Sequence, residues 1–165
     1  MNKTLFNANA YFEKICSSNK LLVGNAFKFT RISGSDLMYE VFRAMDIHRN
    51  IFAIDDTTNG RIVMERNGGY TRVRQFTVFL FMRCEEGNMD QYNSNLNICR
   101  TIHHQIITKI IADSEELYNE LTTIDTESVP FQEFDKYLLN GSTGISFQFL
   151  LKEPVALCYN KSEWT

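Results

Sequence analysis

Apolar side chains recur at two different spacings along the chain, and together these spacings predict a sheet with a long helix beside it. Residues 75–84 form a dense apolar run, which predicts a buried strand. Residues 144–151 alternate between apolar and polar positions, which is typical of a strand with one buried face. Between these runs, apolar residues recur at helical spacing from Leu96 to Ile110. They therefore share one face of a long helix, which we expect to begin near Met89.

Shorter patterns add two helices and further strands before the long helix. Residues 5–16 and 35–45 carry apolar side chains at helical spacing, which predicts two short amphipathic helices. We expect Ser35 to cap the second helix, because a serine hydroxyl accepts a hydrogen bond from a free N–H of the first turn. Residues 19–25 are expected to form a connection. Compact or alternating apolar runs predict strands over residues 26–32, 50–54, 61–65 and 70–82.

Turn residues place the remaining elements. The Asn-Gly-Gly sequence at residues 67–69 predicts a tight hairpin, since such a turn needs the positive φ angles that glycine adopts readily. After the long helix, residues 122–128 are mostly polar, which predicts a connection. Residues 130–138 predict a single helical turn with Phe131 and Phe134 facing inward.

The order helix, strand, helix, three strands, long helix and strand predicts an α+β fold. We expect a small antiparallel or mixed sheet, with the long helix packed on one face and short N-terminal helices beside it. The 165 residues suffice for a single domain over residues 1–165. In this domain Pro154 ends the last strand and residues 152–165 form a C-terminal extension. The strand over residues 70–82 is apolar on both faces, so its second face must be covered by another element or another subunit.

Composition and charge narrow the classes of protein. Hydrophobic residues make up 44% and charged residues 22%, as in ordinary globular proteins. A net charge of −3 argues against a broad DNA-binding face, and we expect no sequence-specific nucleic-acid partner. No apolar run has the length of a signal peptide or a membrane span, so we expect that the protein does not associate with a membrane. The cysteines form no CxxC pair, and we interpret them as buried free thiols of a reducing cytoplasm: Cys16, Cys84, Cys99 and Cys158.

Residues that could carry chemistry do not gather into a known motif. His103 and His104 are neighbours on the long helix and point about 100° apart, so they cannot bind one metal ion together. We interpret them as helix-surface or boundary residues. No phosphate-binding glycine loop, nucleophile elbow or HExxH zinc motif occurs. We therefore expect no catalytic residues, no metal and no cofactor, and we expect that the protein is not an enzyme.

Charged residues cluster in the region of the predicted hairpin. The acid pairs Asp55-Asp56 and Glu85-Glu86 adjoin turn sequences, and we interpret them as solvated loop charges rather than a glycosidase pair. Four arginines also fall close together in this region, and the simplest interpretation is a solvated face of two strands. They are Arg61, Arg66, Arg72 and Arg74.

The order of elements resembles the tail-terminator, or tail-completion, family of tailed bacteriophages. The similarity covers an N-terminal amphipathic helix, a strand at residues 74–82, a polar break, a long helix at residues 95–121 and a closing strand at residues 144–150. Residues 130–164 are also similar to C-terminal segments of phage-type structural proteins from Bacteroidetes. The helix at residues 35–45 and the C-terminal extension depart from the simplest members. These departures leave open another phage neck or tail component, or an adaptor of a contractile injection system.

The resemblance implies a mechanical role without a cofactor. Subunits of this family form a ring, usually hexameric, that caps the tail tube and offers a surface to the head connector. The implied location is the tail or neck of the virion, after assembly in the cytoplasm of a bacterial host. The hairpin and the loop before it are candidates for contacts with other subunits or with the tube, the alternative being that they are simple exposed loops. The candidate residues are Asp55, Asp56, Asn59, Arg61, Arg66, Arg72 and Arg74.

Two other classes of function stay open at this point. A small-ligand or nucleotide-processing enzyme would require a pocket with converging polar residues and shifted pKa values. An adaptor or chaperone-like protein would bind a partner through an uncovered face of the sheet. A stable ring in solution indicates the terminator, whereas a monomer with a polar cleft indicates the enzyme. A monomer or dimer with an apolar groove indicates the adaptor.

Overall fold

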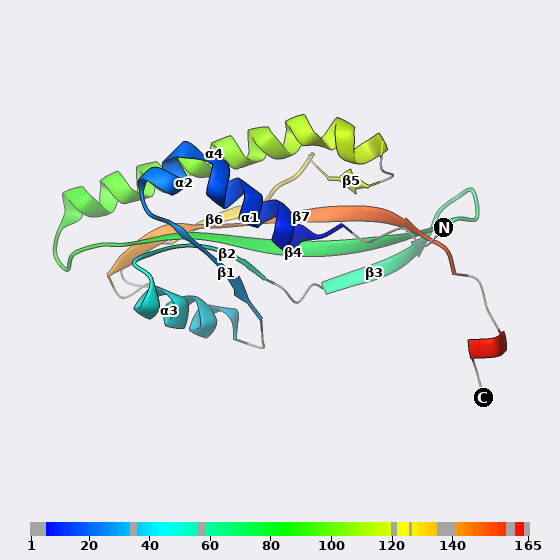
Figure 1. The fold of residues 1–165 in the computed structure, drawn as a ribbon, viewed down its shortest axis with the longest axis horizontal. Coiled ribbons are helices and arrows are strands. Elements are labelled where there is room, and N and C mark those ends of the chain that lie inside the picture. Colours follow the sequence, from blue (N-terminus) through cyan, green and yellow to red (C-terminus); the bar gives the residue numbers. More distant parts are fainter. Residues whose placement is uncertain are drawn as a thin grey trace.

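The fold is built on two long strands that lie side by side across the molecule (Figure 1). β4 (Tyr70–Arg83) and β7 (Ser142–Val155) are each 14 residues long and pair antiparallel over their whole length. The strand expected over residues 70–82 and the closing strand are therefore confirmed. The computed structural model describes residues 6–33, 36–55, 59–119, 122–125, 127–134, 141–157 and 161–163.

Five shorter strands complete a mixed sheet around this pair. On one side of β4, β2 (Asn50–Asp55) pairs antiparallel with its second half and β3 (Asn59–Met64) with its first half. β1 (Lys28–Ile32) pairs with β2 in the parallel direction, which makes the sheet mixed. On the far side, β5 (Thr123–Ile124) and β6 (Phe131–Phe134) both pair with β7.

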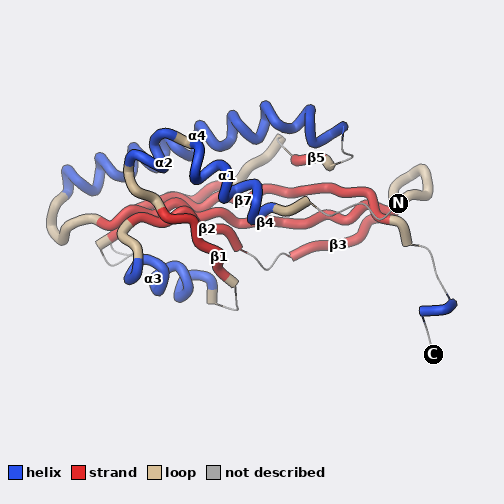
Figure 2. The backbone as a smooth tube through the Cα atoms, viewed as in Figure 1, coloured by secondary structure: helices blue, strands red, loops and turns tan. Residues whose placement is uncertain are grey.

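The helices divide between the two faces of the sheet (Figure 2). The 31-residue α4 (Met89–Asn119) crosses one face together with α1 (Ala8–Ser18) and α2 (Lys20–Gly24). α3 (Leu37–Ile47) lies on the opposite face. The short 3₁₀ helix η1 (Lys161–Glu163) follows the last strand. The expected α+β class, with the long helix on one face and short N-terminal helices, is confirmed.

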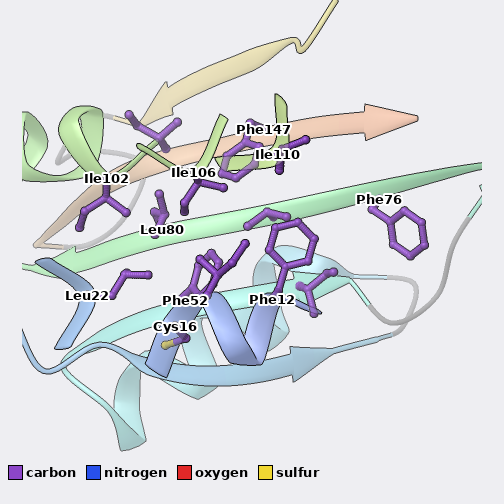
Figure 3. Close-up of a cluster of buried hydrophobic side chains, with 14 of the residues drawn as sticks. Phe12, Cys16, Leu22, Phe52, Phe76, Leu80, Ile102, Ile106, Ile110 and Phe147 are labelled. Carbon is purple, nitrogen blue, oxygen red and sulfur yellow. The ribbon is translucent and has the colours of Figure 1, made fainter. Parts of the chain in front are cut away.

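The larger core fills the space between the sheet and the helices α1, α2 and α4 (Figure 3). Phe12 of α1, Ile106 and Ile110 of α4 and Phe147 of β7 are all fully or almost fully buried there. Removing such a side chain from water stabilises the fold by roughly 1.5–3 kcal/mol. Isoleucine is only a moderate helix former, so α4 owes its stability to this packing rather than to its intrinsic propensity.

A second, smaller core lies on the other face of β4, where α3 covers the second half of the strand. Val41 and Met45 of α3 pack there against Phe79 and Phe81 of β4. Gly144 of β7 lies opposite Phe81, and a Cβ atom at this glycine would collide with the phenylalanine ring. An element of the same chain therefore covers this half of the face, so its apolar residues do not by themselves require a second subunit.

The structure corrects two expectations near the N-terminus. Asp36, rather than Ser35, caps α3, since its carboxylate accepts a hydrogen bond from the Tyr39 N–H at 3.0 Å. Ser35 itself lies outside the described residues. The connection expected over residues 19–25 contains α2, because the Asn19 side chain accepts hydrogen bonds from the Leu21 N–H at 2.9 Å and from the next amide. Asparagine is among the preferred N-cap residues, so one side chain is enough to start this short helix.

Two expectations after the long helix are wrong. The connection expected over residues 122–128 contains β5, whose Ile124 is buried in the larger core. The helical turn expected over residues 130–138 is instead the strand β6, and the rest of that span lies outside the described residues. Phe131 is exposed and Phe134 half-buried, because side chains three positions apart point to opposite faces of a strand.

Pro154 also does not end the last strand. β7 continues to Val155, so the first residues of the expected C-terminal extension belong to the sheet. Even-numbered residues of this strand direct backbone groups away from β4, as the bond from the Gln148 N–H to the Pro130 carbonyl oxygen indicates. No described strand pairs with β7 at Pro154, so its missing N–H breaks no ladder bond.

The depth of α4 in the core gives a first test. Ile106→Ala is expected to lower the free energy of unfolding by about 2–5 kcal/mol, because the substitution leaves a cavity between helix and sheet. Ile111→Ala is the matched control, since this isoleucine on the same helix is 49% exposed and its truncation is expected to cost less than about 1 kcal/mol. Urea unfolding measures both values, and equal losses for the two variants would contradict the packing described.

Candidate interaction surface

The candidate contact residues that the structure describes gather mainly on the β3–β4 hairpin, at one end of the sheet. The Glu65 N–H donates to the Gly69 carbonyl oxygen at 2.7 Å, and the Gly68 N–H donates to the Glu65 carbonyl oxygen at 2.9 Å. Gly68 has a φ of 82°, which glycine adopts without strain. The hairpin expected at residues 67–69 is therefore confirmed, and Figure 1 shows that it extends beyond the ends of α1 and α4.

The charged candidates are not equivalent in the structure. Asn59, Arg61 and Arg66 are exposed on β3 and in the turn, and Arg72 is half-buried on β4. Asp55 is half-buried at the end of β2, where it pairs in register with Ile32 of β1. Asp56 lies outside the described residues. Three of the four predicted arginines are thus accessible or partly accessible on the hairpin, with Arg61 and Arg72 on opposite faces of the sheet.

The fourth arginine, Arg74, forms a buried ion pair within the chain. Its guanidinium lies 2.8 Å from the Glu153 carboxylate, with the two side chains only 17% and 6% exposed. It also donates to the Phe6 carbonyl oxygen at 2.9 Å, while Glu153 accepts from the Phe6 N–H at 2.7 Å. The guanidinium carbon lies 5.0 Å from the centroid of the Phe76 ring. This cluster anchors the segment before α1 to the sheet, at the base of the hairpin.

Sequence reasoning missed the apolar residues of the hairpin. Ile62, Met64 and Tyr70 are 50%, 66% and 38% exposed. The register pairs Met64 with Tyr70 and Ile62 with Arg72, so all of these side chains share one face of the sheet. The alternation of residues 61–65 contained the signal, because it places Ile62 and Met64 on the same side of a strand. The sequence could not show, however, that no helix among the described residues covers Ile62 and Met64.

The opposite face of the same end is hollowed, with both apolar and polar side chains in its lining. One open hollow of about 280 Å³ is lined by Asn59, Gly60, Arg61, Val73, Gln75 and Leu150. A second, of about 180 Å³, shares Gln75 and Leu150 and continues toward Asp125 and Ser128. Gln75 donates to the Gln148 side-chain oxygen at 2.9 Å across the floor. The lining thus combines amide groups and the accessible cation Arg61 with apolar side chains.

His103 on α4 is the one other unusual polar residue. Its Nε2 is a buried side-chain nitrogen without a hydrogen-bond partner, the only such atom among the described residues. The imidazole lies between the rings of Phe131 and Phe147, with centroids 5.3 and 4.9 Å away. Burial lowers the pKa of His103, His104 lowers it further, and Glu133 opposes the change. His103 is therefore a neutral boundary residue at pH 7, in keeping with its interpretation from the sequence.

The described residues offer little for metal or thiol chemistry. Nowhere in the described ranges do three or more His, Cys, Asp or Glu side chains gather in a way that could hold a metal ion. Cys16, Cys84 and Cys99 are buried and free, as predicted, whereas Cys158 lies outside the described part. Burial raises the pKa of Cys16 to about 11 and that of Cys99 to about 12, so both are protonated thiols at neutral pH. No helix in the described segments has both the length and the apolar character needed to cross a membrane.

The sequence matches no protein-family model and no curated protein sequence. The functional argument therefore rests on the geometry of the residues themselves.

The buried cluster at Glu153 gives a second test. Glu153→Leu alone is expected to lower the free energy of unfolding by about 3–5 kcal/mol, because Arg74 then keeps a buried charge without its partner. The double variant Arg74→Met with Glu153→Leu is expected to recover part of this loss, since neither charge remains. Urea unfolding of the two single variants and the double variant gives the coupling energy. Strictly additive losses would show that the two side chains do not act as a pair.

The environment of His103 predicts a pH dependence. The native pKa lies below the ordinary value of about 6.5, so the unfolded chain takes up the proton first as pH falls. This histidine therefore lowers stability as pH falls below about 6.5 and has no effect of this kind above that pH. His103→Leu is expected to flatten the decline in melting temperature between pH 7.5 and pH 5, and His48→Gln, on the far side of the sheet, is the control. An unchanged decline in His103→Leu would contradict the assignment.

Proposed function

We propose that the protein is a structural subunit that assembles with other copies of itself through the β3–β4 end of its sheet. The observation that carries this proposal is the exposure of Ile62, Met64 and Tyr70 together on one face of the sheet. The two large apolar clusters of the described residues are, in contrast, buried in the cores. Aromatic residues, methionine and arginine are enriched in protein interfaces. Arg66 and Arg72 lie next to these apolar residues and add positive charge at the edge of the patch.

In its more specific form, the proposal is a tail-terminator-type role. Copies of the chain would form a ring, hexameric by the resemblance, on the head-proximal end of a phage tail tube. A head-to-tail contact closes into a ring when its rotation permits. The two faces of the β3–β4 end differ, one carrying exposed Ile62, Met64 and Tyr70 and the other an open hollow with Arg61. Such a difference supports contacts with two distinct neighbours, a second subunit and the tube or head connector.

An adaptor is the second candidate, and the open hollows that share Gln75 and Leu150 favour it, since much of their lining is apolar. An adaptor of a phage or of a contractile injection system would bind a partner over this uncovered half of the sheet. We do not propose an enzyme, because the most distinct feature of the described residues is an exposed surface rather than an enclosed polar cavity.

The oligomeric state tests the proposal. Native mass spectrometry and sedimentation are expected to show a defined assembly larger than a monomer, and a six-fold ring in its specific form. Tyr70→Lys is expected to weaken this assembly at least tenfold, because a lysine in place of the ring puts a charge among the exposed apolar residues. Ile47→Lys is the matched control, since Ile47 is a highly exposed apolar residue on α3, away from the hairpin. A wild-type chain that stays monomeric at all concentrations would overturn the proposal.

A further inference from the structure

The outer edge of β3 is the least protected strand edge of the sheet. β3 pairs with β4 on one side, and no described strand pairs with its other side. Figure 2 shows β3 below β4, past the ends of β1 and β2, with no described element along its outer side. Natural proteins protect such edges by keeping them short, charged or covered, because an exposed edge can pair with another chain.

Comparison with the other edges supports this assessment. β5 and β6 are two and four residues long, whereas β3 has six residues. β1 carries the exposed cations Lys28 and Arg31, and charged side chains are one means by which strand edges are protected. On β3, Gly60, Ile62 and Met64 are exposed and uncharged. Among the described edge strands, β3 is thus the longest, and Arg61 is its single charged residue.

The hydrogen bonds of the hairpin determine which backbone groups point outward. Glu65 bonds to Gly69 across the hairpin, so its N–H points toward β4. Backbone groups of an antiparallel strand alternate between the two sides. Val63 and Arg61 therefore also point toward β4, and the N–H and C=O groups of Gly60, Ile62 and Met64 point to the open side. These outward groups belong to the three exposed, uncharged residues.

We propose that two copies of this chain pair β3 with β3 in an antiparallel ladder, with Ile62 opposite Ile62 of the second copy. In this register Gly60 lies opposite Met64 of the second copy, so every outward N–H and C=O group of β3 finds a partner. Arg61 then lies opposite Val63 of the second copy, so no like charges face each other. Sliding the register by two residues in one direction would place Arg61 against Arg61, and sliding it in the other would leave Gly60 without a strand residue opposite it.

The pairing would join the two sheets into one. The side chains of Ile62 from both copies would lie side by side, and each Met64 would cover the bare backbone of Gly60 in the other copy. The contact is isologous, so it makes a dimer, and it can build a larger assembly only in combination with a second type of contact. The inference rests on the proposed self-association and adds the strand, the register and the symmetry of one contact.

Amide hydrogen exchange, followed by NMR at low and high protein concentration, tests the pairing residue by residue. The Ile62 and Met64 amides are expected to exchange rapidly in the monomer and at least tenfold more slowly in the assembled protein, since only a second strand can bond to them. The Arg61 and Val63 amides are the internal control, because they bond to β4 and stay protected at both concentrations. Concentration-independent exchange of the Ile62 amide in an assembled sample would overturn the pairing.

A proline variant provides the second measurement. Ile62→Pro removes an outward N–H without removing a bond between β3 and β4, and proline is tolerated at strand edges. It is expected to weaken dimer formation at least tenfold in sedimentation, whereas Ile62→Val, which keeps the N–H, is expected to dimerise as the wild type does. Retained protection of the Val63 amide shows that the hairpin of the variant is folded. If the variant does not fold, the exchange of the wild-type amides decides the question alone.

The outcomes separate this inference from the proposed function. A two-fold dimer, or an assembly with an even number of subunits, that weakens in Ile62→Pro supports the pairing. An assembly that persists in folded Ile62→Pro, together with an unprotected Ile62 amide in the assembled wild type, overturns the pairing and leaves the structural role standing. A chain that stays monomeric at every concentration overturns both.

Discussion

The antiparallel ladder between β4 and β7 is the constraint on which the rest of the structure depends. It joins segments about seventy residues apart on average, and closing so long a loop carries an entropic cost that only extensive burial can offset. The burial comes from side chains that meet across the ladder, such as Phe76 and Phe149, whose rings stack 5.3 Å apart. Every other described strand except β1 pairs directly with one of these two. The helix α4 lies in the chain between them and packs back onto both.

At the β3–β4 end the ladder extends past the helices that cover it, and this offset divides the sheet into a covered and an uncovered half (Figure 1). Over the second half of β4, α4 and α1 cover one face and α3 covers the other, so both faces are core. Over the first half, the cluster of Arg74, Glu153 and Phe6 marks where the cover ends. Beyond it the sheet continues with the exposed apolar residues of the hairpin on one face, a hollow on the other and an open edge at β3. A stable interior and an accessible strand pair are thus two parts of one continuous sheet.

The sequence predicted the elements whose pattern is long and periodic, and it missed those that depend on distant neighbours. α4, β4 and β7 were predictable because their apolar spacing extends over many residues. β5 and β6 were not, because their strand form comes from pairing with β7 rather than from alternation of their own. The arginines of the hairpin form a cluster in the sequence. The ion pair between Arg74 and Glu153 could not be predicted, since the two residues lie 79 positions apart. The exposure of Ile62 and Met64 likewise depends on where the helices end, which no local pattern contains.

The turn at the tip of the hairpin has a practical consequence. Arg66, Asn67 and Gly68 are exposed and take no part in either core. The segments on the two sides of this turn are held together by the ladder of β2 with β4 and by the contacts of α1 with the opposite half of the chain. A polypeptide interrupted at this point would therefore retain all of its interior contacts. The fold is thus suited to reconstitution from two separately produced fragments, whose reunion could report on the proximity of proteins fused to them.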